Sequence, residues 1–148
     1  MNNYGPPRRF KVVNTETGEE TPIMELFPSP QIGDFCGTFP GVNLDAKALK
    51  THGKRFGSTG KTYQSTGRAD SDGNEYFFGD VLCYLNPQMQ RELLVVEYSG
   101  VEGIILRDIK DRLYRKISQA LQYHVIGNRH IPFAELERRA AEKIEIHW

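Results

Sequence analysis

Short apolar runs separated by turn-forming residues fill the second half of the chain and limit it to strand-rich folds. Val81–Leu85, Leu93–Tyr98 and Ile104–Arg107 are rich in aliphatic and β-branched residues, and Tyr123–Ile126 ends at Gly127-Asn128. Such runs are typical of β-strands. Because the connections are short, we expect antiparallel neighbours in a meander, which at this size tends to curl into a small barrel.

Turn-forming residues also predict a hairpin near the start of the chain and two later turns. Asn14–Glu19 is polar and contains a Gly, and it lies between the strand-like runs Arg9–Val13 and Glu20–Leu26, which predicts a hairpin. Asp70–Asn74 predicts a tight turn. Asn86-Pro87 predicts another.

The segments between the hairpin and the Asp70–Asn74 turn are less regular. Phe27–Gly41 is rich in Pro and Gly and is expected to be irregular. Asp45 can cap a short helix over Ala46–His52. Lys54–Ala69 has little apolar periodicity and is expected to be loop, with one strand around Tyr63.

Two longer helices follow from apolar residues at helical spacing. The first is expected after Asp108, a suitable N-cap, with one apolar face made of Ile109, Leu113, Ile117, Ala120 and Leu121. The second begins at Pro132, and Glu135 and Lys143 near its ends suit the helix dipole. Its apolar stripe comprises Phe133, Leu136, Ala140 and Ile144.

Reactive and metal-binding residue types are few and scattered. Cys36 and Cys83 have no C-x-x-C partner and lie among apolar neighbours, so both are expected to be small buried hydrophobes. The four histidines form no H-x-H or H-E-x-x-H pair. We therefore expect no metal and no cofactor. No run approaches the roughly 20 apolar residues of a membrane span, so no membrane partner is expected.

Charge is neutral in total but uneven along the chain. Basic residues outnumber acidic ones in residues 1–69 and again in residues 109–148, whereas acidic residues outnumber basic ones in residues 70–108. Within Ala46–Ala69 there are six cations, no acidic residue, and the aromatic residues Phe56 and Tyr63. This composition is typical of segments that grip phosphates and stack bases. The candidate nucleic-acid-binding residues are Lys54, Arg55, Lys61 and Arg68. The alternative is a basic loop that stays solvated or pairs with the acidic stretch.

Two ligand motifs are only superficial. Gly57–Thr62 suggests a phosphate loop, but Arg55 occupies the position of the first Gly, and no amphipathic helix follows to supply converging amides. The Asp70-x-Asp72 pair suggests a calcium loop, but its Gly comes too early and Val81 stands where the last acidic ligand belongs. A turn explains the second pattern better.

Two blocks of the chain resemble YopX-like proteins. Gln64–Leu82 is similar to their block in which Thr-Gly precedes an Asp, a Gly, a Glu and a Gly-Asp pair. Tyr123–Asn128 is similar to their closing strand, Leu94–Tyr98 to the strand between, and Pro132–Leu136 to the element that follows. The resemblance extends over Gln64–Leu136, about half of the chain. It departs at His130 and Ile131, and Gly33–Lys61 has no clear counterpart.

Residues and resemblance together predict an α+β, β-rich fold. Residues 1–62 would form a hairpin and an irregular subdomain, and residues 63–148 a small open, SH3-like β-barrel with a C-terminal helix. Gly73 and Gly79 of the shared block are expected to shape bends, as scaffold and not as chemistry.

The resemblance implies a protein of phages or prophages, with no activity attached to the family. We therefore expect a non-enzymatic accessory protein in the cytoplasm of the bacterial host. It would bind a host or phage protein, or itself, through an edge strand of the open barrel. One alternative is nucleic-acid binding by the basic segment 47–68. Another is a small hydrolase or nuclease, which needs His, Asp and Glu side chains to converge in one cleft.

Overall fold

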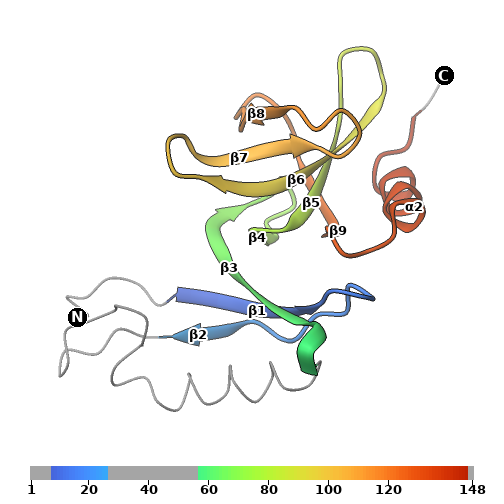
Figure 1. The fold of residues 1–148 in the computed structure, drawn as a ribbon. Coiled ribbons are helices and arrows are strands. Elements are labelled where there is room, and N and C mark those ends of the chain that lie inside the picture. The colour runs from blue at the N-terminus through green and yellow to red at the C-terminus, as the bar shows by residue number, and fades with distance from the viewer. Residues whose placement is uncertain (1–7, 27–56, 147–148) are drawn as a thin grey trace. The chain divides into compact units, whose positions relative to one another are not determined.

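The computed structural model describes residues 8–26 and 57–146. These residues form two antiparallel sheets and one C-terminal helix (Figure 1), which confirms the predicted α+β, β-rich class. The chain divides into two compact units, Met1–Ser65 and Thr66–Trp148, with the division inside one strand. The sequence prediction placed its boundary slightly earlier, after residue 62. The predictions for Phe27–Gly41 and Ala46–His52 lie outside the described residues.

The first unit contains the predicted hairpin. Strand β1 (Arg8–Asn14) pairs with β2 (Met24–Leu26), and the turn between them is closed by a 2.7 Å bond from the Gly18 amide to the Asn14 carbonyl. On its other side β1 pairs with the first half of β3 (Gly60–Ala69). The strand expected around Tyr63 is therefore confirmed, but it is longer than expected, and the loop expected over the rest of Gly60–Ala69 is wrong. A short 3₁₀ turn, η1 (Gly57–Thr59), leads directly into a ten-residue strand.

The second unit is the predicted meander. Its five-stranded sheet has the order β8-β7-β6-β5-β9, and all of its pairs are antiparallel. Within the described residues β8 and β9 do not pair, so the sheet stays open. A short strand, β4, pairs with the end of β3. The strands are β4 (Glu75–Phe77), β5 (Asp80–Leu85), β6 (Arg91–Ser99), β7 (Gly103–Asp108), β8 (Tyr114–Lys116) and β9 (His124–Asn128).

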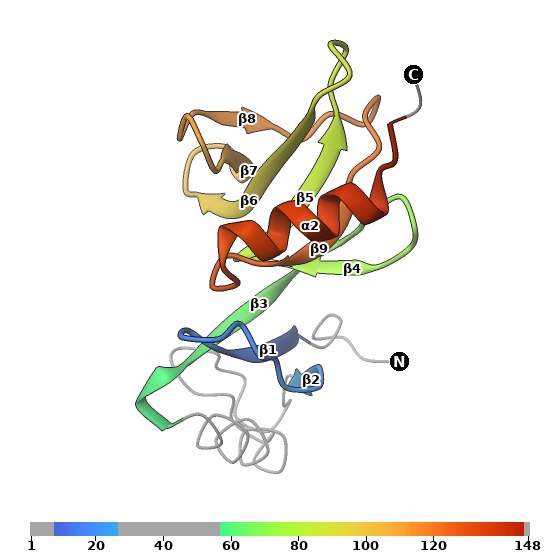
Figure 2. The same cartoon turned by 90° about the vertical axis from the view of Figure 1, so that its right-hand side faces the viewer.

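The alternation of side chains along β5, β6 and β7 gives this sheet two apolar faces. One face is covered by helix α2 (Phe133–Lys143), which packs Leu136 and Ala140 on it (Figure 2). The sheet residues of this face are Val81, Cys83, Leu93, Val95 and Ile126. The opposite face carries Leu82, Tyr84, Leu94, Val96 and Leu106, packed with Tyr76 and Tyr123. None of the helices among the described residues is long and apolar enough to cross a membrane.

The two glycine turns within Gln64–Leu82 have the backbone geometry expected of bends. Gly73 and Gly79 have φ angles of 84° and 87°, which L side chains rarely adopt. The Gly79 amide donates to the Val96 carbonyl at 2.8 Å, and the buried Asp80 carboxylate accepts from the Phe77 amide at 2.8 Å. The bend between β4 and β5 is thus held by buried polar groups.

The helix predicted after Asp108 is wrong. Asp108 does cap a turn, because its carboxylate accepts from the Lys110 and Asp111 amides at 2.7 and 3.2 Å. Only one turn forms, since Arg112 takes a φ of 66°, and the chain then pairs with β7 as strand β8. Ile109 packs on one face of the sheet and Ile117 on the other, so the helical spacing did not reflect one helix face.

Candidate functional site

The structure describes two of the four predicted nucleic-acid-binding residues, Lys61 and Arg68, and they belong to different units. Lys54 and Arg55 lie outside the described residues. Lys61 belongs to the first unit, on β3, with its ammonium 5.3 Å from the centre of the Tyr63 ring. Arg68 belongs to the second unit, near the end of the same strand, and is exposed. Since Lys61 and Arg68 belong to different units, they do not define one described site.

A second arrangement brings together a His, an Asp and a Cys that the sequence did not connect. His124 Nδ1 lies 2.9 Å from Asp72 Oδ2, and Lys143 Nζ lies 2.7 Å from the same oxygen. Hydrogen bonds from Lys143 and then His124 lower the pKa of Asp72. His124 also pairs with Cys83 across β9 and β5. Within residues 8–26 and 57–146, no group of three or more His, Cys, Asp and Glu is arranged to hold a metal ion.

The Cys83 thiol is buried, in contrast to a catalytic nucleophile. Burial raises its pKa to about 11, and the nearby charges of Lys143 and Arg91 oppose this shift only in part. A reactive cysteine needs the opposite, an exposed thiol with a lowered pKa. The arrangement of Cys83, His124 and Asp72 is therefore not suited to nucleophilic catalysis.

We predict that Cys83 resists alkylation in the folded protein. With a pKa of about 11 in place of 9.0, the thiolate fraction at pH 8 is about a hundredfold lower than in the unfolded chain. The same difference lowers folding stability as the pH rises from about 9 towards 11. Iodoacetamide labelling of a Cys36→Ser variant, native and in denaturant, measures the ratio. Equal rates in the two states would contradict the burial of the thiol.

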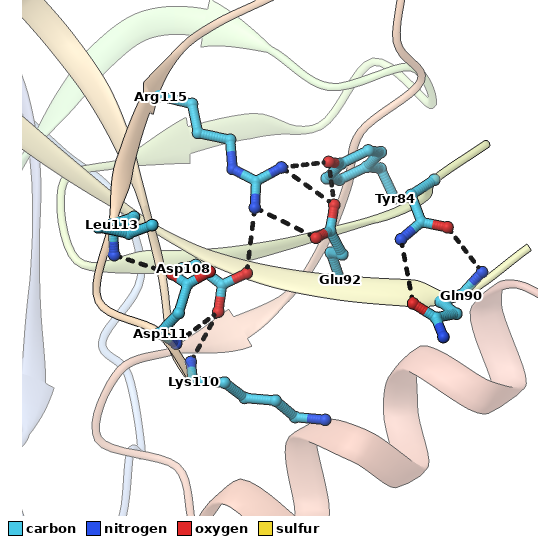
Figure 3. Close-up of polar contacts among 9 residues, drawn as sticks. Tyr84, Gln90, Glu92, Asp108, Lys110, Asp111, Leu113 and Arg115 are labelled. Atoms are coloured by element: carbon cyan, nitrogen blue, oxygen red, sulfur yellow. Dashed lines mark hydrogen bonds and ion pairs between the residues drawn. The ribbon is translucent and has the colours of Figure 1, made fainter. Parts of the chain in front are cut away.

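A polar network joins four strands of the second unit, and Figure 3 shows the Arg115 guanidinium at its centre. This guanidinium lies 2.8 Å from the Tyr84 hydroxyl, 3.1 and 3.2 Å from the Glu92 carboxylate, and 3.5 Å from Asp108 Oδ2. Tyr84 also donates to Glu92. We call Tyr84, Glu92, Asp108 and Arg115 the Arg115 network.

Two members of the Arg115 network, Tyr84 and Arg115, have pKa values raised above their ordinary values. Burial, together with the neighbouring Glu92 carboxylate, raises the pKa of Tyr84 to about 12. Burial opposes the charge of Arg115, but its bonds to Glu92 keep the pKa of the guanidinium above its usual value. A general acid or base needs a pKa near the working pH. Tyr84 and Arg115 therefore suit a structural role, in which their contacts with Glu92 tie β8 to β5 and β6.

The outer backbone of β8 has no partner within the described residues. The Asp108 amide donates to the Leu113 carbonyl at 2.8 Å, so these two residues form a hydrogen-bonded pair. Such pairs alternate along an antiparallel ladder, and the register then makes Leu106 and Arg115 the next one. The N–H and C=O groups of Tyr114 and Lys116 therefore point away from β7, at the edge of the sheet.

The side chains at this edge are exposed and include two large apolar groups. Leu113 and Tyr114 are 66% and 54% exposed. Arg112 and Lys116 flank them, and neither forms an ion pair with a described residue. We call Arg112–Lys116 the β8 edge. The sequence did not indicate it, because the same residues had been assigned to a helix. The Asp108 and Asp111 turn formers were the signal that a strand could begin here.

The opposite edge of the sheet is closed by the chain itself. The Val125 amide donates to Asp70 Oδ2 at 2.9 Å, and the Ser71 amide donates to the Tyr123 carbonyl at 3.0 Å. The Arg139 guanidinium donates to the Ile126 carbonyl at 3.0 Å. Side chains and a turn thus occupy the backbone groups along β9 that an added strand would use.

The chain matches no protein-family model and no curated protein sequence. The resemblance to YopX-like proteins therefore rests on the residues of Gln64–Leu136 alone.

Proposed function

We propose that this chain is a YopX-like, non-enzymatic accessory protein of a phage or prophage that binds another protein in the cytoplasm of the bacterial host. Binding takes place by strand addition, in which an extended segment of the partner pairs with the β8 edge. The observation that carries the proposal is the outward N–H and C=O groups of Tyr114 and Lys116 beside exposed Leu113 and Tyr114.

The chemistry of the β8 edge indicates what kind of segment it takes. Main-chain bonds to Tyr114 and Lys116 require an extended partner, and Leu113 and Tyr114 offer apolar area to its side chains. Arg112 and Lys116 favour acidic residues in the partner. If two copies of this chain paired through their β8 edges, Arg112 and Lys116 of one copy would face the same cations of the other. This repulsion makes self-association less favourable than the binding of an acidic segment of another protein.

The Arg115 network prepares this edge for binding. Arg115 holds the middle of a strand of only three residues against Glu92 and Tyr84, so the outward amides on either side of it are fixed before a partner arrives. Fixing the edge in advance reduces the ordering entropy that binding costs.

We predict that Lys116→Pro weakens partner binding without unfolding the protein. Proline removes an outward N–H and is compatible with an edge strand, and Arg115 before it is already extended. The probe is a set of peptides selected from a random display library on the full chain. Losing one or two main-chain bonds should weaken their binding about 3- to 30-fold, measured by calorimetry.

The matched control is Lys116→Ala, which removes the charge but keeps the amide. It should weaken binding by no more than about fivefold. NMR spectra of both variants establish that the fold is kept. Selected peptides that bind Lys116→Pro as well as the parent chain, or that shift amides away from Tyr114–Lys116, would refute strand addition here. If the chain alone forms a dimer and Lys116→Pro dissociates it, the partner at the β8 edge is a second copy of the chain and not an acidic segment of another protein.

A further inference from the structure

A pocket of about 390 Å³ lies within the second unit, and part of its lining is Ile117, Ser118 and Gln119, which directly follow β8. This volume is in the range of pockets that hold small ligands. Its wall combines apolar side chains with hydrogen-bonding groups. The lining includes Arg68, Ser71, Tyr76, Ile117, Ser118, Leu121 and Tyr123.

Tyr76 gives this pocket a polar group that lacks a protein partner. The residue is only 3% exposed, and its hydroxyl makes no hydrogen bond with any residue that the structure describes. No fully buried side-chain N or O atom in residues 8–26 and 57–146 is left unsatisfied, so this hydroxyl oxygen must reach the open space of the pocket. Burial raises the pKa of Tyr76, which keeps the hydroxyl protonated and able to donate. A buried hydroxyl of this kind is satisfied by a ligand or water.

Arg68 supplies a cation at the same pocket. Its guanidinium forms no ion pair within the described part of the chain, and its positive charge acts on the Tyr76 hydroxyl, whose pKa it lowers against the effect of burial. Asp70 also lines the pocket, but its oxygens accept from the Asp72, Asn74 and Val125 amides at 2.8–2.9 Å. Arg68 is thus the lining cation available for an anion.

We propose that this pocket binds one nucleotide unit, with the phosphate on Arg68 and the base between the apolar wall and the Tyr76 hydroxyl. Arginine is well suited to phosphate because its planar fork donates two parallel hydrogen bonds. Ile117 and Leu121 supply apolar contact for a flat ring. The hydroxyls of Tyr76 and Ser118 supply hydrogen bonds to the heteroatoms of a base.

The composition of the wall argues for a base over an alkyl chain. A fatty acid would place methylene groups against the Tyr76 and Ser118 hydroxyl groups and offer their O–H donors no acceptor. A heteroaromatic ring can satisfy them. The wall also favours an anionic ligand, since Arg68 is the positively charged residue that lines the pocket. The nucleotide can belong to a single strand or be free, and both share this chemistry.

The test is titration of the full chain with thymidine 5′-phosphate and with an oligothymidylate of about eight residues, followed by NMR at low salt. Amides of Ile117, Ser118 and Tyr123 should shift. Arg68→Gln should weaken binding about tenfold or more, since it removes a charged partner. Tyr76→Phe should weaken it about 3- to 10-fold and leave folding stability unchanged, because the hydroxyl has no protein partner to lose.

The matched control is Arg129→Gln, which makes the same change in net charge at an exposed residue that does not line the pocket. It should leave binding within about twofold of the parent chain. Tighter binding of the oligomer than of the mononucleotide identifies a strand as the source, and equal binding identifies a free nucleotide. The proposal is overturned if neither probe shifts these amides, or if Arg129→Gln weakens binding as much as Arg68→Gln. Peptide binding at the β8 edge is measured separately, so either proposal can fail alone.

Discussion

Leu94→Ala is expected to lower the free energy of unfolding by about 2–5 kcal/mol. Leu94 is 1% exposed and lies in the middle of β6, where Leu82 and Leu106 from the neighbouring strands share its face. Removing its branched end leaves a cavity between three strands that are held by their ladders and cannot close in. Chemical denaturation monitored by circular dichroism measures the loss.

Leu113→Ala is the matched control for Leu94→Ala, because it removes the same atoms at a side chain that is 66% exposed. It should change stability by less than about 0.5 kcal/mol. A similar loss for both variants would mean that the face carrying Leu94 is not the core of the second unit. Leu113→Ala should still weaken binding of the selected peptides, since Leu113 belongs to the β8 edge.

Gly127→Ala is expected to destabilise the protein by about 2 kcal/mol or more. An added Cβ would lie 2.6 Å from Ile131 Cδ1 and 3.1 Å from both Leu136 Cδ2 and the Arg139 guanidinium. Ile131 and Leu136 are buried in the cluster beneath α2, so they cannot move aside freely. The φ angle of 158° adds strain for any L side chain. Thermal unfolding of the variant measures the effect.

Gly100→Ala is the control for Gly127→Ala. Nothing lies within 4 Å of a Cβ added at Gly100, which is in the turn between β6 and β7. The change should therefore be close to neutral. If Gly127→Ala is also neutral, the loop between β9 and α2 must be able to shift, and the close approach of α2 to β9 is not a requirement of the fold.

The meander and the last helix could be predicted because local and tertiary preferences agree there. Turn formers at Asp70–Asn74 and Asn86-Pro87 define where strands end, and β-branched residues fill the runs between them. Pro132 marks the start of α2, and Leu136 and Ala140 are buried as the stripe predicted. Phe133 of the same stripe is 37% exposed, with the Lys110 ammonium 5.8 Å from the centre of its ring.

The full length of β3 and the existence of β8 could not be predicted, because pairing with residues distant in the sequence determines both. Lys61–Ala69 lacks apolar periodicity, and it becomes a strand because β1 and β4 pair with it. Tyr114–Lys116 follows a well-capped turn that could have continued as a helix. Arg115 instead bonds to Glu92 and Tyr84, which lie more than twenty residues away in the sequence. A single sequence does not show such pairings.

The candidate sites were predicted only in part. Arg68 was singled out by its charge, and it does line a pocket. Tyr76 lies in Gln64–Leu82, the block that resembles YopX-like proteins, and it was not singled out, because nothing in a sequence shows whether a buried hydroxyl has a partner. The contact between His124 and Asp72 joins residues 52 positions apart, so it also needed the fold.

The unequal edges of the five-stranded sheet limit the stoichiometry of any complex built by strand addition. Asp70, Ser71 and Arg139 form hydrogen bonds with backbone groups along β9. In the five-stranded sheet, a second chain can therefore add its strand only at the β8 edge. Once that position is filled, the pair offers no further template through this sheet. A protein built in this way forms complexes of defined size, whereas a sheet with two available sides could propagate into a fibre.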